Sequence, residues 1–160
     1  MTNSKNNINT VPDTKLDKVR RAVGAIVVKD NKFLLVQRFM RLTKDGMKKI
    51  EPEWDIIKGG IDEDKSSRVA MMRELYEETG SKKFIIVKQF ENVLSYPLIK
   101  ESEFDRQEII MFLIRYDGKL SDLKPDYEEI SAIEWFTYSQ AISKIKYDET
   151  REFFKKYAHN

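Results

Sequence analysis

Runs of β-branched and apolar residues mark the first strands of the chain. Two such runs, Ala22 to Val28 and Lys32 to Gln37, are separated by Lys29, Asp30 and Asn31. A short polar stretch between two apolar runs is typical of a β-hairpin. The sequence therefore predicts that the sheet begins with two antiparallel strands.

The next stretch, Phe39 to Pro52, is rich in charged residues and shows no hydrophobic periodicity. We interpret it as a long loop that borders a ligand cleft, because irregular surface segments often carry binding residues. The short apolar run Trp54 to Ile57 then predicts a strand that leads directly into Lys58, Gly59 and Gly60.

One helix is predicted in the middle of the chain. Ser66 or Ser67 is suited to cap its N-terminus, the helix extends to about Thr79, and Gly80 is the expected residue just past its end. At about 100° per residue, apolar side chains form a broad packing arc and three carboxylates gather opposite it. The arc consists of Val69, Met71, Met72, Leu75, Tyr76 and Thr79, and the carboxylates are those of Glu74, Glu77 and Glu78.

Further apolar runs after this helix complete the predicted fold. Phe84 to Leu94, Gln107 to Tyr116 and Ile133 to Phe136 have the composition of strands. From Ser139 the apolar spacing predicts a terminal helical region, interrupted around Lys146 to Asp148. The sum is an α/β (α+β) architecture, in which a mixed β-sheet is packed between helices.

Length and composition limit the domain organisation. The chain has 160 residues, which suits one domain. Residues 1–17 are mostly polar and are expected to form a flexible arm, which leaves residues 18–160 as the folded domain. The sequence shows neither an apolar run of membrane-spanning length nor a secretory signal, so we expect a cytoplasmic protein without membrane contact. The sequence does not indicate the oligomeric state.

Several kinds of chemistry are excluded by the residues that are rare or absent. There is no cysteine, and His159 is the only histidine. Thiolate nucleophiles and cysteine-ligated metals are therefore excluded, and a histidine-based triad or metal site is not expected. The formal net charge of +2 is nearly balanced and does not indicate a surface that coats nucleic acid.

The three glutamates of the predicted helix allow two interpretations. An acidic helix is often an ordinary surface helix, with carboxylates paired to basic neighbours such as Arg73. However, three carboxylates within about one turn repel one another, and a bridging cation such as Mg²⁺ or Mn²⁺ removes that cost. Such a cation would also suit a phosphate substrate.

The segment from Gly59 to Gly80 resembles the Nudix box, G-x5-E-x7-R-E-U-x-E-E-x-G-U, in which U is aliphatic. Lys65 stands where that pattern has its first Glu, and Ser81 stands where it has an aliphatic residue. We expect Lys65 to alter the number or affinity of bound metal ions rather than activity itself. The matching residues are Gly59, Arg73, Glu74, Leu75, Glu77, Glu78 and Gly80.

This resemblance extends over residues 20–158 and implies a Nudix fold and a Mg²⁺-dependent or Mn²⁺-dependent hydrolase. The implied reaction is attack of water on a diphosphate linked to a nucleoside. By the same resemblance Glu77 and Glu78 would hold the metal ions, and Glu74 would be a ligand or the general base. Glu129 would reach the metal, although it could equally be an ordinary loop carboxylate.

Other residues receive roles from the resemblance or from their chemistry. The Lys58 carbonyl would complete the metal shell, and Arg73 would hold the helix carboxylates by charge-assisted hydrogen bonds. Gly59 and Gly60 would let the backbone approach the phosphate. Cationic partners for a polyphosphate are sought among Arg38, Arg41, Lys48, Lys49 and Lys58, and an adenine platform among Tyr96 and Phe104.

The substrate within this family is left open by the box itself. The tail from Trp135 to Phe154 is similar to that of the diadenosine polyphosphate hydrolases, whose relatives remove pyrophosphate from RNA 5′ ends. We therefore expect a dinucleoside polyphosphate or an RNA 5′ end to be the preferred substrate. The alternatives are a mononucleotide or nucleotide-sugar pyrophosphatase, and a catalytically weak Nudix-fold module that binds a nucleotide or RNA.

Overall fold

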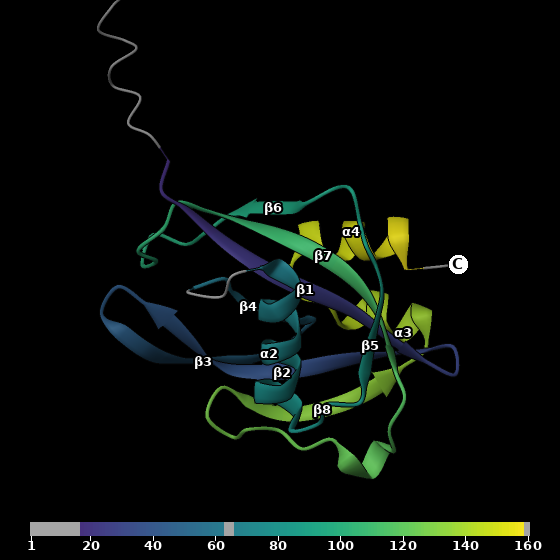
Figure 1. The fold of residues 1–160 in the computed structure, drawn as a ribbon. Coiled ribbons are helices and arrows are strands. Elements are labelled where there is room, and N and C mark those ends of the chain that lie inside the picture. The colour runs from purple at the N-terminus through teal and green to yellow at the C-terminus, as the bar shows by residue number, and fades with distance from the viewer. Residues whose placement is uncertain (1–16, 63–65, 159–160) are drawn as a thin grey trace, which may run out of the picture.

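The computed structural model describes residues 17–62 and 66–158 (Figure 1). Apart from Asp17, the predicted N-terminal arm lies outside these ranges, as do Lys65 and His159. No helix in the described part of the chain has the length and apolarity needed to cross a bilayer.

The fold is a mixed eight-stranded sheet with helices on both faces. Its main strand order is β3-β2-β1-β7-β5, with β4 pairing to β1, β6 to β7 and β8 to β2. β1 and β7 are parallel and the other pairs are antiparallel. The strands are β1 (Val19–Lys29), β2 (Lys32–Thr43), β3 (Gly46–Asp55), β4 (Ile57–Gly60), β5 (Phe84–Gln89), β6 (Leu94–Pro97), β7 (Arg106–Tyr116) and β8 (Ile130–Phe136), and the helices are α2 (Ser67–Thr79), η1 (Leu120–Asp122), α3 (Tyr138–Lys144) and α4 (Asp148–Tyr157).

The alternation of side chains along β1 divides the core into two layers. Ala22 and Ile26 belong to the cluster that includes residues of α3 and α4. Val23 and Val27 belong to the cluster that includes residues of α2. Successive side chains of a strand point to opposite faces, so one strand supports both layers. The predicted mixed sheet between helices is confirmed, and Figure 1 shows α2 on one side of it and α3 and α4 on the other.

The predicted opening hairpin is confirmed. Asp30 and Asn31 have positive φ values of 51° and 63° and form its two-residue turn. Positive φ at both turn positions matches the right-handed twist of the flanking strands, and Asp and Asn tolerate it. Next to this turn β1 pairs with β2, whereas farther along β1 pairs with β4 and β2 pairs with β3.

The loop predicted for Phe39 to Pro52 is wrong. β2 continues to Thr43, and after a turn at Lys44 and Asp45 the chain returns as β3. Most of this hairpin is exposed to solvent, so its sequence lacks the hydrophobic alternation from which a strand is predicted. The polar turn preceding Gly46, which has φ 102°, is the signal that could have identified the hairpin.

The single strand predicted for Phe84 to Leu94 is also incorrect. β5 ends at Gln89, and a separate strand, β6, begins at Leu94. Tyr96 consequently lies in β6 and not in a loop. The terminal helical region is interrupted where it was predicted, between α3 and α4.

The predicted caps of the central helix are confirmed, whereas its predicted packing arc is partly wrong. Ser66 caps the N-terminus of α2, and Gly80 ends the helix in the left-handed conformation with φ 75°. Val69 and Tyr76 of the predicted arc are 55% and 48% exposed. The helix instead turns part of its acidic side toward the sheet, and its buried residues are Ala70, Met71, Glu74, Leu75, Glu78 and Thr79.

The N-cap yields a test of how α2 is held. The Ser66 hydroxyl accepts a hydrogen bond from the Val69 backbone N–H at 3.1 Å. Ser66→Ala is expected to lower the free energy of unfolding by about 1 kcal/mol, because that N–H loses its partner. Chemical denaturation measures the change, with Ser67→Ala as the matched control. Equal losses in the two variants would contradict the assignment of the cap.

Candidate active site

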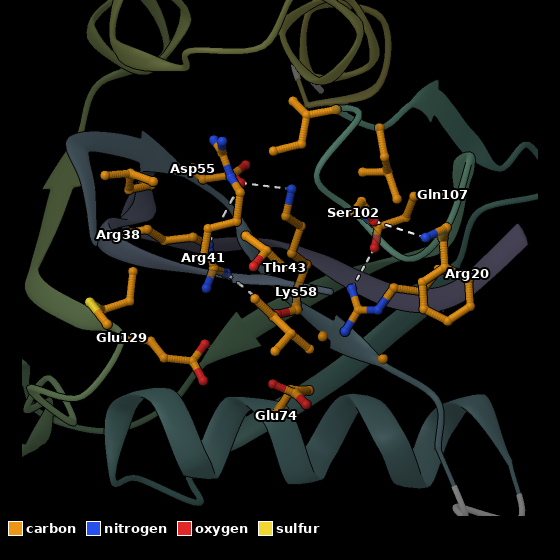
Figure 2. A pocket seen from close by; sticks show the side chains of 18 of the residues that line it. Arg20, Arg38, Arg41, Thr43, Asp55, Lys58, Glu74, Ser102, Gln107 and Glu129 are labelled. Atoms are coloured by element: carbon orange, nitrogen blue, oxygen red, sulfur yellow. Dashed lines mark hydrogen bonds and ion pairs between the residues drawn. The ribbon is translucent and has the colours of Figure 1, made fainter. Parts of the chain in front are cut away.

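A cavity of 430 Å³ lies between α2, the β2–β3 hairpin, β4, β6 and the segment before β7 (Figure 2). Of the site residues predicted from the sequence, Lys48 and Lys49 lie outside its lining, and the structure brings the others into it from widely separated parts of the chain. The predicted residues that line the cavity are Arg38, Arg41, Lys58, Gly59, Gly60, Arg73, Glu74, Glu77, Glu78, Tyr96, Phe104 and Glu129.

One end of the cavity, which we term the acidic end, is formed by Glu74, Glu77 and Glu78 of α2 and by Glu129. Glu129 comes from the segment before β8, and Figure 2 shows its side chain and that of Glu74 at this end. The segment before β8 is fixed by Asp126, whose carboxylate accepts hydrogen bonds from the backbone N–H groups of residues 128, 129 and 130. The backbone thus holds Glu129 beside the glutamates of α2.

Arg73 orients the helix carboxylates in the manner expected from the sequence. Its guanidinium donates to Glu74 at 2.8 Å, to Glu77 at 3.3 Å and to the Gly60 carbonyl at 3.0 Å. Charge-assisted bonds of this kind are stronger than neutral ones. Arg73 therefore connects α2 to the end of β4 and fixes the direction of Glu74.

Gly59 is required by its neighbour Glu74. A Cβ atom at position 59 would overlap the Glu74 carboxyl group. The backbone of β4 and the α2 carboxylate approach closely only because position 59 lacks a side chain. The predicted approach of a substrate phosphate to Gly59 and Gly60 stays a prediction.

The Arg38 guanidinium binds carboxylates and backbone carbonyls of the protein. Its guanidinium is buried, donates to Glu78 at 3.3 Å and to the Ile56 carbonyl at 3.2 Å, and lies 3.7 Å from Asp55. It also donates to the Lys58 carbonyl at 3.4 Å, the oxygen predicted to complete a metal shell. The predicted contact of Arg38 with substrate stays a prediction, and its structural role is to hold Glu78 against β4.

Burial shifts the pKa values of two carboxyl groups at the acidic end. It raises the pKa of Glu78 to about 8, an effect that Arg38 opposes and the nearby Glu74 reinforces. Burial also raises the pKa of Glu74, although Arg73 opposes that shift. Removing these carboxylates from water favours their neutral forms, and a positive charge placed among them would favour the ionised forms.

The acidic end suits a divalent cation in its chemistry. In residues 17–62 and 66–158, no three acidic or histidine side chains are close enough together to hold a metal ion as they stand. The available donors are nevertheless carboxylate oxygens, which are the ligands that Mg²⁺ and Mn²⁺ prefer. A cation would also offset the desolvation that raises the pKa of Glu78.

Basic side chains line the middle of the cavity, and we term Lys58, Arg20 and Arg41 the cationic strip. The Lys58 ammonium lies 2.8 Å from the fully buried Asp55 carboxylate and donates to the Tyr96 hydroxyl. Burial alone would lower the pKa of Lys58, but the charge of Asp55, the interaction with Tyr96 and the hydrogen bond to Asp55 together outweigh it, and the pKa is raised. Lys58 therefore remains an ammonium, and Arg20 and Arg41 add positive charge to the same lining.

The predicted adenine platform is only partly available. Tyr96 is 5% exposed, its hydroxyl accepts from Gln107 at 2.8 Å, and its ring is stacked on Tyr147 at 6.0 Å. A ring held in this way forms the wall of the cavity rather than an open platform. Phe104 is half-buried in the lining. The other apolar side chains of the lining are Met40, Leu42, Ile50, Pro97, Leu98 and Ile99.

Sequence reasoning missed several polar residues of the cavity. Asp55 was treated as part of a short strand, although a charged residue within an apolar run is a signal of a buried partner. Glu53 and Tyr147 meet across the cavity, where the tyrosine hydroxyl donates to the carboxylate at 2.5 Å. Nothing local in the sequence indicates this contact, because 94 positions separate the two residues.

Comparison with known proteins shows the family of this chain. The NUDIX domain family model matches residues 18–157. An RNA pyrophosphohydrolase from Nitratiruptor sp. is 27% identical over 151 residues, which cover 87% of this chain and 95% of that protein. An RNA pyrophosphohydrolase from Pelagibacter ubique is 30% identical over 127 residues, which cover 73% and 75%.

A solved structure shows the same fold. A NUDIX hydrolase from Nitrosomonas europaea superimposes with a TM-score of 0.70 at 20% identity, covering 88% of this chain and 89% of the other. With a family match over most of its length, the chain belongs to the Nudix hydrolase family. It is a pyrophosphohydrolase that acts on nucleotide derivatives, in a family that generally uses divalent metal ions.

Asp55 provides a direct test of the cationic strip. Asp55→Asn removes the negative charge between Lys58 and Arg38 while keeping the side-chain size. We expect the free energy of unfolding to fall by about 3 kcal/mol or more, because two buried cations lose a partner. Urea denaturation measures this loss, and Glu51→Gln on the exposed part of β3 is the control. A loss below about 1 kcal/mol would show that the strip does not depend on Asp55.

Proposed function

We propose that this protein removes pyrophosphate from the triphosphorylated 5′ end of RNA with the help of Mg²⁺ or Mn²⁺. The observation that carries the proposal is the arrangement of the cavity, in which the acidic end adjoins the cationic strip. A triphosphate needs cations along its length, and a metal at the point of cleavage. The choice of RNA is supported by the Nitratiruptor and Pelagibacter relatives, which are RNA pyrophosphohydrolases.

The metal ions would be held by Glu77 and Glu78, with Glu129 and the Lys58 carbonyl as further ligands. When bound, a divalent cation supplies Lewis acidity toward phosphate oxygens and water. Glu74 is either a further ligand or the base that accepts a proton from the attacking water. Its carboxylate is suited to both roles, because Arg73 fixes its direction at 2.8 Å.

The remaining residues bind and orient the substrate. Lys58 faces the cavity from β4 with its charge maintained by Asp55, and we assign it to the phosphates. Gly59 and Gly60 keep side chains away from the same region. Apolar side chains such as Leu42 and Phe104 offer a surface for the first nucleobase.

A dinucleoside polyphosphate is the second candidate substrate. It is favoured by the entry of the C-terminal tail into the cavity, where Tyr147, just before α4, stacks on Tyr96. The cytoplasmic location expected from the sequence stays a prediction.

The metal-binding role of the helix glutamates is tested by substitution. Glu77→Gln and Glu78→Gln are each expected to lower kcat/KM by at least about 100-fold while the fold persists, because each change removes a ligand charge but keeps the size of the side chain. Steady-state kinetics over a series of Mg²⁺ concentrations should also show a raised metal requirement. Glu91→Gln, at an exposed position away from the cavity, is the control. Near-normal rates in both cavity variants would refute the assignment.

The substrate is tested by a panel at saturating Mg²⁺. We expect RNA with a 5′-triphosphate, or a dinucleoside tetraphosphate, to have a higher kcat/KM than any nucleoside triphosphate or ADP-sugar. Their longer anionic chains match the extended cationic lining. A clear preference for a mononucleotide or sugar nucleotide would overturn the choice of substrate. Binding without turnover of any compound would instead indicate a catalytically weak binding module.

A further inference from the structure

The β2–β3 hairpin, residues 41–51, contributes Arg41 to the cavity lining and carries further positive charge outside that lining. Figure 1 shows this hairpin at one end of the sheet, extending past the body of the domain. Its acidic residues are Asp45 and Glu51. Its basic residues are Arg41, Lys44, Lys48 and Lys49.

Lys48 and Lys49 are placed by strand register next to the cavity. Lys48 pairs with Arg41 across the hairpin, and Lys49 pairs with Met40. Arg41 and Met40 line the cavity, whereas the two lysines do not. Of the side chains that the sequence offered as partners for a polyphosphate, Lys48 and Lys49 therefore lie beside the cavity rather than in its lining.

The charges of these lysines are not neutralised by neighbouring carboxylates. Arg41 is held by Glu53 at 3.5 Å and by the Tyr147 hydroxyl at 2.7 Å. Within the described ranges no ion pair involves Lys48 or Lys49, and both residues are exposed. Exposed, unpaired lysines are available to bind an external anion.

The hairpin is also fixed in position. Its tip is held by a hydrogen bond from the Lys44 backbone N–H to the Glu101 carbonyl at 2.9 Å. Within the turn, the Thr43 hydroxyl donates to the Gly46 carbonyl at 2.8 Å and accepts from the Asp45 N–H at 3.1 Å. The lysines therefore stand at a defined distance from the cavity rather than on a freely moving arm.

We propose that Lys48 and Lys49 bind the phosphodiester backbone of an RNA chain whose 5′ end occupies the cavity. This inference rests on the proposed function. A cavity of 430 Å³ is of the size that holds one small-molecule ligand, so nucleotides after the first must lie outside it. Their phosphates then meet the rim, and lysine contacts to phosphate give affinity without reading sequence. A mononucleotide has no such phosphates to offer.

The experiment measures binding and turnover separately. Fluorescence anisotropy without divalent metal gives the Kd for labelled 5′-triphosphate RNA of about eight nucleotides, a length at which several phosphates lie beyond the cavity. Kinetics with Mg²⁺ give kcat/KM for that RNA and for a nucleoside triphosphate. The test variant is Lys48→Ala/Lys49→Ala. The control is Lys29→Ala/Lys32→Ala, a cross-strand lysine pair beside the other turn of β2.

The test variant is expected to bind the RNA about 10-fold more weakly, with a matching rise in KM for RNA and little change for the nucleoside triphosphate. The slope of log Kd against log salt should fall by about 1.4, from about 0.7 for each lysine. The control should behave as the wild type does.

Four results would overturn the inference: unchanged RNA binding in the test variant, a wild type that does not bind the RNA, an equal loss with the nucleoside triphosphate, or an equal loss in the control. RNA binding that depends on the lysines in a wild type without turnover would support the inference while refuting the proposed function.

Discussion

Asp55 is buried at the point where the chain changes its pairing partner, and the site depends on the charges it holds there. β3 pairs with β2 up to Asp55, and β4 pairs with β1 from Ile57 onward. Between the two strands, the Ile56 carbonyl accepts from Arg38, which also reaches Asp55 and Glu78. A buried charge of this kind persists only with partners. The Asp55 carboxylate thus holds both the Arg38 guanidinium and the Lys58 ammonium in place.

Two arginines hold glutamates of the acidic end in place. Arg38 holds Glu78 from the sheet, and Arg73 holds Glu74 from within the helix. Gly59 lets the helix and β4 come close enough for those contacts. The result is a set of carboxylates that are partly removed from water, with raised pKa values for Glu74 and Glu78. The fold therefore maintains an unfavourable concentration of negative charge that a divalent cation would relieve.

The sequence predicted the parts of this arrangement that are local. The caps of α2, the hairpin at Asp30 and Asn31, and the spacing of the glutamates all follow from short-range rules. It failed where tertiary contacts decide, as in the exposed face of Tyr76 and the strand character of the β2–β3 hairpin. The ion pairs of Arg38 with Asp55 and with Glu78 could not be foreseen in detail, because these residues meet only through sheet pairing and helix packing.

The chemistry of the site depends above all on metal binding at the acidic end. This binding is tested most directly by crystals grown with Mn²⁺ and examined by anomalous diffraction. We expect an anomalous peak within coordination distance, about 2.2 Å, of carboxylate oxygens of Glu77 and Glu78. A well-ordered cavity without such a peak at saturating Mn²⁺, or a peak bound only elsewhere on the protein, would contradict it.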